Sequence, residues 1–352
     1  MQRFGLGALA ILLEVVATLP GGQSPAAPVE AYAAAVRVYA ATGEPAAAVE
    51  GIRDWSLDRF GEAVREYAMR ADADLDVAAV LQLEFGMLSV TAAPDLASQH
   101  LDLGHELVQR LRARALTPWR MSNDAAAAFA ERWHLAAVSV FLYANDAGRA
   151  GPFIDRGLEL TPASAGLRLM AGLASELRGL SLGVDDRSGI LTRGTRAQEE
   201  RNRLLRWAEN AYRQLLTDQP AFARARVRLG RLLWTLGRPA AAMAELERGR
   251  TDAREPSQQY LAAMFLGGLH DEKGEHDAAR TAYEQALAIV PVSQAATVAL
   301  GHLDVMAGRP DRARARASAF LSHPPVADPW WTYENGGIEW EAVHWLRRTV
   351  RQ

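Results

Sequence analysis

A spacing of 34 residues recurs in the second half of the chain, and it constrains the fold more than any other feature. Self-similarity at such a period is typical of a stacked array of small units, because one unit alone cannot bury its apolar face. The sequence therefore predicts repeats. The matched positions are Leu266 and Leu300, Gly267 and Gly301, Gly274 and Gly308, Ala279 and Ala313, and Pro291 and Pro325.

The same pattern extends upstream, with one large irregularity. Pro162 and Pro220 are each followed by a glycine ten residues later and by another seven residues further on, as Pro291 is. Counted from Pro162 with the spacing of the other repeats, the tyrosine position falls near residue 188, but the tyrosine occurs only at Tyr212. The shift predicts an insertion of about 24 residues, around residues 180–205.

The pattern of each repeat predicts two antiparallel helices. No segment shows the alternation of apolar and polar residues that is typical of a strand. The first glycine of each pair lies inside a helix, where it costs about 1 kcal/mol relative to alanine. We therefore expect a neighbouring helix to approach it closely. The second glycine is expected to end the helix in a left-handed conformation, as is Asn145 upstream. Tyr212, Leu246 and Tyr283 are expected to fill the space between repeats.

At these residues the sequence resembles the tetratricopeptide repeat family. The spacing Gly-x6-Gly-x4-Ala, with a later Tyr and Pro, is clear from about Arg132 to Pro325, although the early tryptophan usual in that family is missing. The resemblance implies an all-α, right-handed superhelical solenoid of antiparallel helix pairs. It also implies that a protein or peptide partner binds in a concave groove lined by the first helix of each repeat.

Four regions follow from this reading. Residues 1–26 are expected to form a signal peptide or a hydrophobic segment, and residues 27–130 to form a helical region that is either degenerate repeats or a cap. Residues 131–325 hold the repeats and the insertion. Residues 326–352 form an aromatic-rich loop and a C-terminal capping helix, Ile338 to Val350, whose tryptophans either pack on the last repeat or form an exposed docking segment.

The N-terminal segment follows the plan of a signal peptide. Arg3 supplies a positive charge, residues 4–19 are mostly apolar apart from Glu14, and small residues follow up to Ala26. We expect an exported protein, periplasmic or extracellular, with membrane proximity through this segment as a further consequence. If the segment is instead a buried first helix, the protein is cytoplasmic.

No motif for catalysis or for a cofactor is present. The absence of cysteine excludes disulfides, thiol nucleophiles and cysteine–zinc sites. His100 and His105 lie about 140° apart around a helix, so they do not share a ligand face. His270 and His276 flank a turn that is best interpreted as solvated. The sequence therefore predicts no catalytic residue, no metal site and no cofactor.

The resemblance places groove positions by counting from the first glycine of each repeat. The candidates for partner binding are Arg132, Tyr143, Arg224, Val227, Arg231, Trp234, Met264, Asp271 and His302.

Arg224, Arg228 and Arg231 share one helical stripe without acidic partners three or four residues away. The net charge of −3 disfavours nucleic acid as a partner. We predict a non-catalytic scaffold or adaptor. The alternatives are an all-helical enzyme with carboxylates in the groove, and a cytoplasmic regulator or nucleic-acid adaptor that uses the Arg224–Arg231 stripe. The oligomeric state is left open.

Overall fold

The structure is a computed structural model, and it describes residues 29–42, 56–114, 121–182, 195–324, 328–334 and 339–350. These residues form helices and turns, without any strand, which confirms the predicted all-α class. The predicted signal peptide at 1–26 lies outside the described residues. Within the described residues, no helix combines the length and the apolar character needed to cross a membrane.

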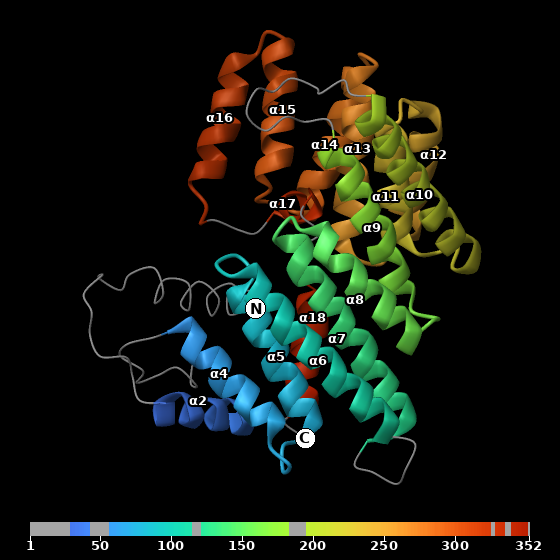
Figure 1. Cartoon of the computed structure of the whole chain (residues 1–352). Coiled ribbons are helices and arrows are strands. Elements are labelled where there is room, and N and C mark those ends of the chain that lie inside the picture. Colours follow the sequence, from blue (N-terminus) through green and yellow to red (C-terminus); the bar gives the residue numbers. More distant parts are fainter. Residues whose placement is uncertain are drawn as a thin grey trace. The chain divides into compact units, whose positions relative to one another are not determined.

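The chain divides into two compact units, each described by itself. The first comprises residues 1–167 and 338–352, and the second comprises residues 168–337. The division lies inside a helix, and it does not coincide with the boundary near residue 130 that the sequence predicts. The first unit contains α2 (Val29–Thr42), α4 (Leu57–Met69), α5 (Leu75–Ser89), α6 (Pro94–Arg114), α7 (Asn123–Tyr143), α8 (Ala147–Leu160) and α18 (Trp340–Thr349) (Figure 1).

The second unit holds the regular repeats as successive helix pairs. They are α9 (Ala165–Ser181, which begins in the first unit) with α10 (Thr195–Asp218), α11 (Ala223–Thr235) with α12 (Pro239–Asp252), α13 (Pro256–Glu272) with α14 (His276–Ile289), and α15 (Gln294–Met306) with α16 (Pro310–Leu321), followed by the short α17 (Pro329–Glu334) (Figure 1). In the described part of the predicted insertion, the extra residues lengthen α10, which has 24 residues.

In three of the helix pairs, the glycine predicted to end the first helix does so. Gly237, Gly274 and Gly308 have φ angles of 71°, 75° and 71°, and Asn145 has a φ of 59°. Glycine populates this region without the steric penalty of a Cβ atom, and asparagine tolerates it better than most residues do. Gly179 differs from the prediction, because it lies inside α9 against Leu205.

The glycines inside the first helices lie where a large side chain of the second helix packs. A Cβ atom placed on Gly267 would lie 2.4 Å from Cε1 of Tyr283. The same atom on Gly172 or Gly230 would lie 2.5 Å from Tyr212 or Leu246. The predicted close approach is confirmed. These side chains fill the space within a helix pair, however, whereas the sequence analysis placed them between repeats.

The last pair departs from this pattern. Ala317 stands 34 residues after Tyr283, and a Cβ atom on Gly301 would meet nothing nearer than Ala313, at 3.9 Å. No residue of α16 is buried. The predicted C-terminal helix exists as α18, and within the first unit it packs against α7. Its apolar stripe (Ala342, Val343 and Leu346) is buried there.

Three histidines are buried in the first unit: His100, His105 and His134. His134 Nδ1 donates to the carbonyl of Ala130 at 2.7 Å, and its Nε2 accepts from His105 Nδ1 at 2.9 Å. His100 Nδ1 lies 2.6 Å from the Gln82 side-chain oxygen. Burial lowers the pKa of both His100 and His134 to about 4, so both rings are neutral at pH 7. Both ring nitrogens of His134 have hydrogen-bond partners, whereas Nε2 of His100 is buried without one among the described residues.

Candidate functional site

A C-terminal segment lies on the first helices of the repeats in each unit. In the first unit this segment is α18. Arg347 of α18 donates from Nε and Nη2 to the two carboxylate oxygens of Glu84 on α5, at 2.6 and 2.7 Å. Both side chains are largely buried, so the bidentate pair is shielded from water. On α7, Ser139 accepts the backbone N–H of Glu339 at 3.0 Å, and the guanidinium of Arg132 lies 4.4 Å from the ring centre of Trp345.

In the second unit the corresponding segment is residues 328–334, which we call the tail segment. Asp328 is almost fully buried, and its Oδ1 accepts from the Tyr260 hydroxyl at 2.7 Å. Its Oδ2 accepts from the Ser293 hydroxyl at 2.9 Å and from the N–H of Ala295 at 3.0 Å. These three donors form what we call the carboxylate site.

The carboxylate site is suited to an ionised carboxyl group. Its backbone donor belongs to the first turn of α15, where the helix dipole favours a negative charge. Burial raises the pKa of Tyr260, and Asp328 raises it further, although the contact with Ser293 lowers it. The phenol therefore keeps its proton and acts as a donor.

Two aromatic side chains of the tail segment pack on α13. The rings of Trp330 and Tyr333 lie 5.0 and 4.9 Å from the ring of Phe265. The Arg228 guanidinium lies 3.7 Å from the ring centre of Tyr333, and it also donates to that residue's carbonyl. Trp331 points elsewhere and is more than half exposed. The sequence analysis predicted a loop here, with tryptophans that either pack on the last repeat or form an exposed docking segment. The structure has a short helix that packs on α13.

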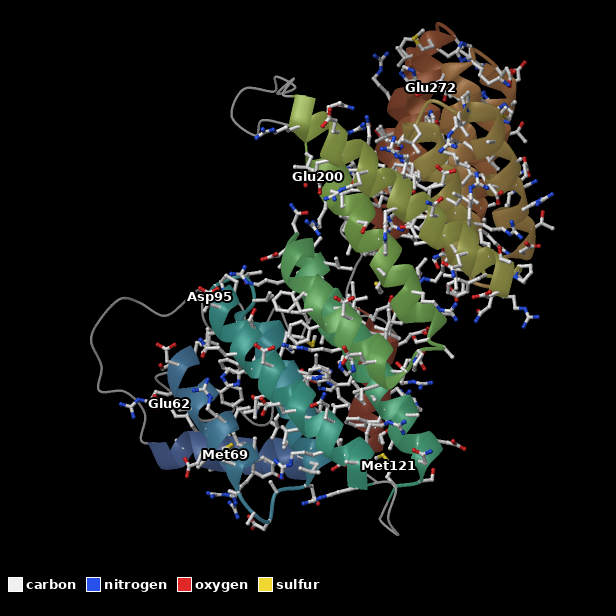
Figure 2. All side chains as sticks on the ribbon, turned by 45° about the vertical axis from the view of Figure 1, so that its right-hand side comes forward. Glu62, Met69, Asp95, Met121, Glu200 and Glu272 are labelled. Atoms are coloured by element: carbon white, nitrogen blue, oxygen red, sulfur yellow. The ribbon has the colours of Figure 1, made fainter. Side chains whose placement is uncertain are left out.

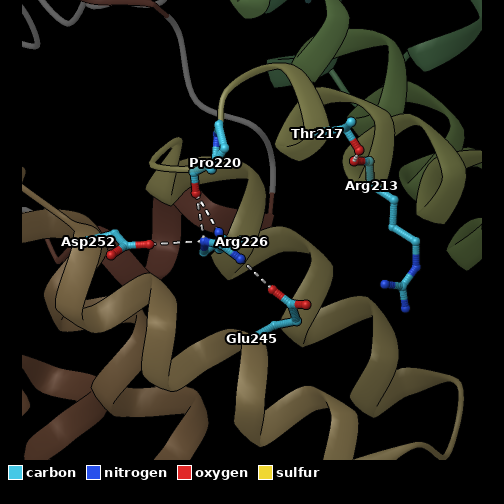
Figure 3. A network of polar contacts seen from close by, with 6 residues as sticks. All are labelled: Arg213, Thr217, Pro220, Arg226, Glu245 and Asp252. Atoms are coloured by element: carbon cyan, nitrogen blue, oxygen red, sulfur yellow. Dashed lines mark hydrogen bonds and ion pairs between the residues drawn. The ribbon is translucent and has the colours of Figure 1, made fainter.

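The arginines of α11 are engaged by residues from other helices. Arg226 donates to Glu245 at 2.9 Å, to Asp252 at 3.1 Å and to the carbonyl of Pro220 (Figure 3). Arg228 lies 3.9 Å from Glu176 of α9. The acidic partners missing within the helix are therefore supplied by α9 and α12. Of the predicted stripe, Arg228 thus has an acidic neighbour on another helix, and Arg226 beside the stripe has two.

The first helix of the last pair carries an exposed apolar face. Val298, Val305 and Met306 of α15 are each more than half exposed. His302 lies on the same helix, 3.8 Å from Asp271 of α13. Next to Asp271, Glu272, labelled in Figure 2, accepts the indole N–H of Trp234 at 2.7 Å. This face offers an apolar strip beside a group of charged side chains.

Comparisons with known proteins agree with this architecture. The tetratricopeptide repeat family matches the chain twice, over residues 207–264 and over residues 262–291. Residues 207–291 therefore carry tetratricopeptide repeats. The matched region runs from α10 to α14, inside the range where the sequence resembles the family.

Solved structures of low identity are also similar. The human IFIT1 dimer with m7Gppp-AAAA is 14% identical, with a TM-score of 0.41, over 90% of this chain and 67% of that chain. Yeast Tom70 is 11% identical, with a TM-score of 0.39, over 98% of this chain and 69% of that chain. No curated protein matches the sequence.

The predicted groove residues have different environments. Arg132 and Tyr143 belong to the first unit, and the others belong to the second. Val227 and Met264 are buried and contribute to the core, because each faces its own helix pair. Arg231 lies 5.2 Å from the ring of Trp234 and 5.8 Å from that of Phe265, next to the tail segment. Arg224 is half-buried.

Several residues of the candidate site were not predicted. Tyr260, Ser293 and Glu84 have ordinary helix or cap positions, and nothing in the local sequence marks them. Asp328 carried a signal that could have been used. An aspartate directly before a proline is a typical start of a helix, and the two tail-segment aromatics follow it at helical spacing.

Proposed function

We propose that this protein is a non-catalytic scaffold that binds a protein or peptide partner on the first helices of its repeats. One observation carries the proposal. Both units hold a peptide-like segment on these helices, α18 on α7 and α17 on α13. Binding a helical segment along a helical surface is a common mode of peptide recognition.

The exposed face of α15 supports the same proposal. Single exposed apolar side chains are ordinary, but three on one face of one helix favour a contact with another molecule. A partner that lies along α15 would cover Val298, Val305 and Met306. Asp271 and His302 lie beside this strip and offer polar contacts to the rim of such an interface.

The two alternatives receive less support. An enzyme would be favoured by paired carboxyl groups with raised pKa values. Among the described carboxyl groups, those with a resolved shift, such as Asp304 and Glu275, have a lowered pKa. A nucleic-acid adaptor would use the cations of the Arg224–Arg231 stripe, but Arg228 lies 3.9 Å from Glu176 and the Arg231 guanidinium lies over the rings of Trp234 and Phe265.

Site-specific crosslinking tests the proposal. A photoreactive amino acid replaces Met306 on α15 in the full chain, and a matched control replaces Arg248, an exposed residue of the second helix α12. We expect a discrete crosslinked partner from native extract with the probe at position 306 and none with the probe at position 248.

The complementary variant removes the apolar strip by the substitutions Val298→Ser and Val305→Ser, both at exposed positions. We expect this variant to keep the helicity and melting temperature of the parent and to lose the crosslink at position 306. Equal crosslinking from both probes, or a crosslink that survives these substitutions, contradicts partner binding on the first helices.

A further inference from the structure

The tail segment shows what the second unit can recognise. Its anchor is one buried carboxylate, Asp328, held by the hydroxyls of Tyr260 and Ser293 and by the N–H of Ala295. A neutral amide in this place would present an NH2 group toward donors, so the site discriminates in favour of an acid.

Two aromatic positions follow the acid at fixed intervals. Trp330 and Tyr333 come two and five residues after Asp328, and the helical turn brings both rings onto Phe265. The neighbouring aromatic residue, Trp331, makes no such contact among the described residues and is more than half exposed. The recognised pattern is therefore an acid, then an aromatic at the second position after it and another at the fifth.

The last aromatic position is held mainly through its ring. The Tyr333 hydroxyl is buried without a hydrogen-bond partner among the described residues. The ring itself is held by Phe265 and by the guanidinium of Arg228. A phenylalanine would keep these contacts and would avoid burying an unpaired polar group. The site is built for an aromatic ring here, and a tyrosine is not its best occupant.

We propose that the carboxylate site, Phe265 and Arg228 form a binding site for a partner segment that carries aspartate followed two and five residues later by aromatic side chains. The chain's own tail segment occupies this site, and the partner must displace it. The inference rests on the proposed scaffold function and names the chemistry of the partner. Because the tail segment is tethered, it competes at an effective concentration of about millimolar.

A labelled, end-blocked peptide with the sequence of residues 328–334 tests the proposal by fluorescence anisotropy. Two variants of the full chain weaken the internal occupant, namely Asp328→Asn and the double substitution Trp330→Ala/Tyr333→Ala. We expect each to bind the peptide at least about tenfold more tightly than the parent chain, because the tethered competitor is weakened. The matched control, Trp331→Ala, binds as the parent does.

The peptide and the site are varied in the same assay. We expect the peptide with Asp328→Asn to bind about tenfold more weakly, because it loses hydrogen bonds to a charged group. The peptide with Tyr333→Phe binds equally well or better. In the double variant, Tyr260→Phe weakens binding about tenfold, since it removes one donor from the carboxylate.

Circular dichroism and melting establish that each variant is folded, and if the double variant is not, the single variant Asp328→Asn decides. The proposal is overturned if the peptide binds neither variant, or if the aspartate and asparagine peptides bind alike. Such a result leaves the crosslinking test of the scaffold function untouched, because that test does not use this peptide. Failure of the crosslink at position 306 is thus a separate outcome.

Discussion

Two equivalent glycines, 34 residues apart, should respond to the same substitution in opposite directions. Gly267 and Gly301 both lie inside first helices, in α13 and α15. A methyl group on Gly267 would lie 2.4, 2.6 and 2.8 Å from three ring atoms of Tyr283. A methyl group on Gly301 would meet only the Cβ of Ala313, at 3.9 Å.

The magnitude follows from two opposing terms. Alanine is favoured over glycine inside a helix by about 1 kcal/mol. Overpacking of a dense core costs about 1 to 3 kcal/mol, and three contacts more than 0.5 Å below the carbon–carbon optimum of about 3.5 Å favour the upper end. We expect Gly267→Ala to destabilise by about 2 kcal/mol and Gly301→Ala to stabilise by about 1 kcal/mol.

Urea denaturation of the full chain, followed by circular dichroism, measures both changes if the slope stays constant. The double variant Gly267→Ala/Tyr283→Ala checks the cause. In the Tyr283→Ala background the ring is absent, so the added methyl should no longer destabilise. The reasoning is refuted if both glycine substitutions shift the midpoint in the same direction, or if removing the ring leaves the effect of Gly267→Ala unchanged.

Three further predictions concern buried polar groups. Because His100 and His134 have folded pKa values of about 4, below the ordinary 6.5, the unfolded chain binds protons first on acidification. The free energy of unfolding should therefore fall between pH 6.5 and 4, by on the order of 3 kcal/mol per histidine. In urea denaturation across this pH range, the midpoint should fall less for the variant His100→Gln than for the parent chain. The substitution Arg347→Ala removes the bidentate partner of the buried Glu84 carboxylate, and it should cost about 3 kcal/mol of stability and the hydrogen-exchange protection of α18. Arg348→Ala, at an exposed position, should change neither, and equal effects of the two substitutions contradict the role of the ion pair. The substitution Arg226→Met removes the common partner of Glu245 and Asp252 and should destabilise the protein by about 2 kcal/mol. This value is modest because both carboxylates are partly exposed. Thermal melting measures the effect, and an unchanged melting temperature would argue against the network.

The sequence alone determined the repeat and its local geometry. The ends of the first helices at Gly237, Gly274 and Gly308 could be predicted because a left-handed residue is a local requirement that few residue types meet. The close approach at Gly267 could be predicted as well, because a glycine inside a helix is costly unless a neighbour packs against it. Which side chain packs there could not, since the sequence analysis placed Tyr283 between repeats. The features that could be predicted depend on residues that are near one another in the chain.

Only the tertiary structure decided what occupies the first-helix faces and which charges remain free. Arg347 binds Glu84, which is 263 residues away in the sequence, and Asp328 binds Tyr260, which is 68 residues away. The stripe of Arg224, Arg228 and Arg231 on α11 was predicted to be basic because its helix carries no acidic partners, but Arg228 lies near Glu176 of α9. Arg226, beside the stripe, pairs with Glu245 of α12. A charge interacts with whatever lies within a few ångströms, and packing brings together residues that have no fixed spacing in the sequence.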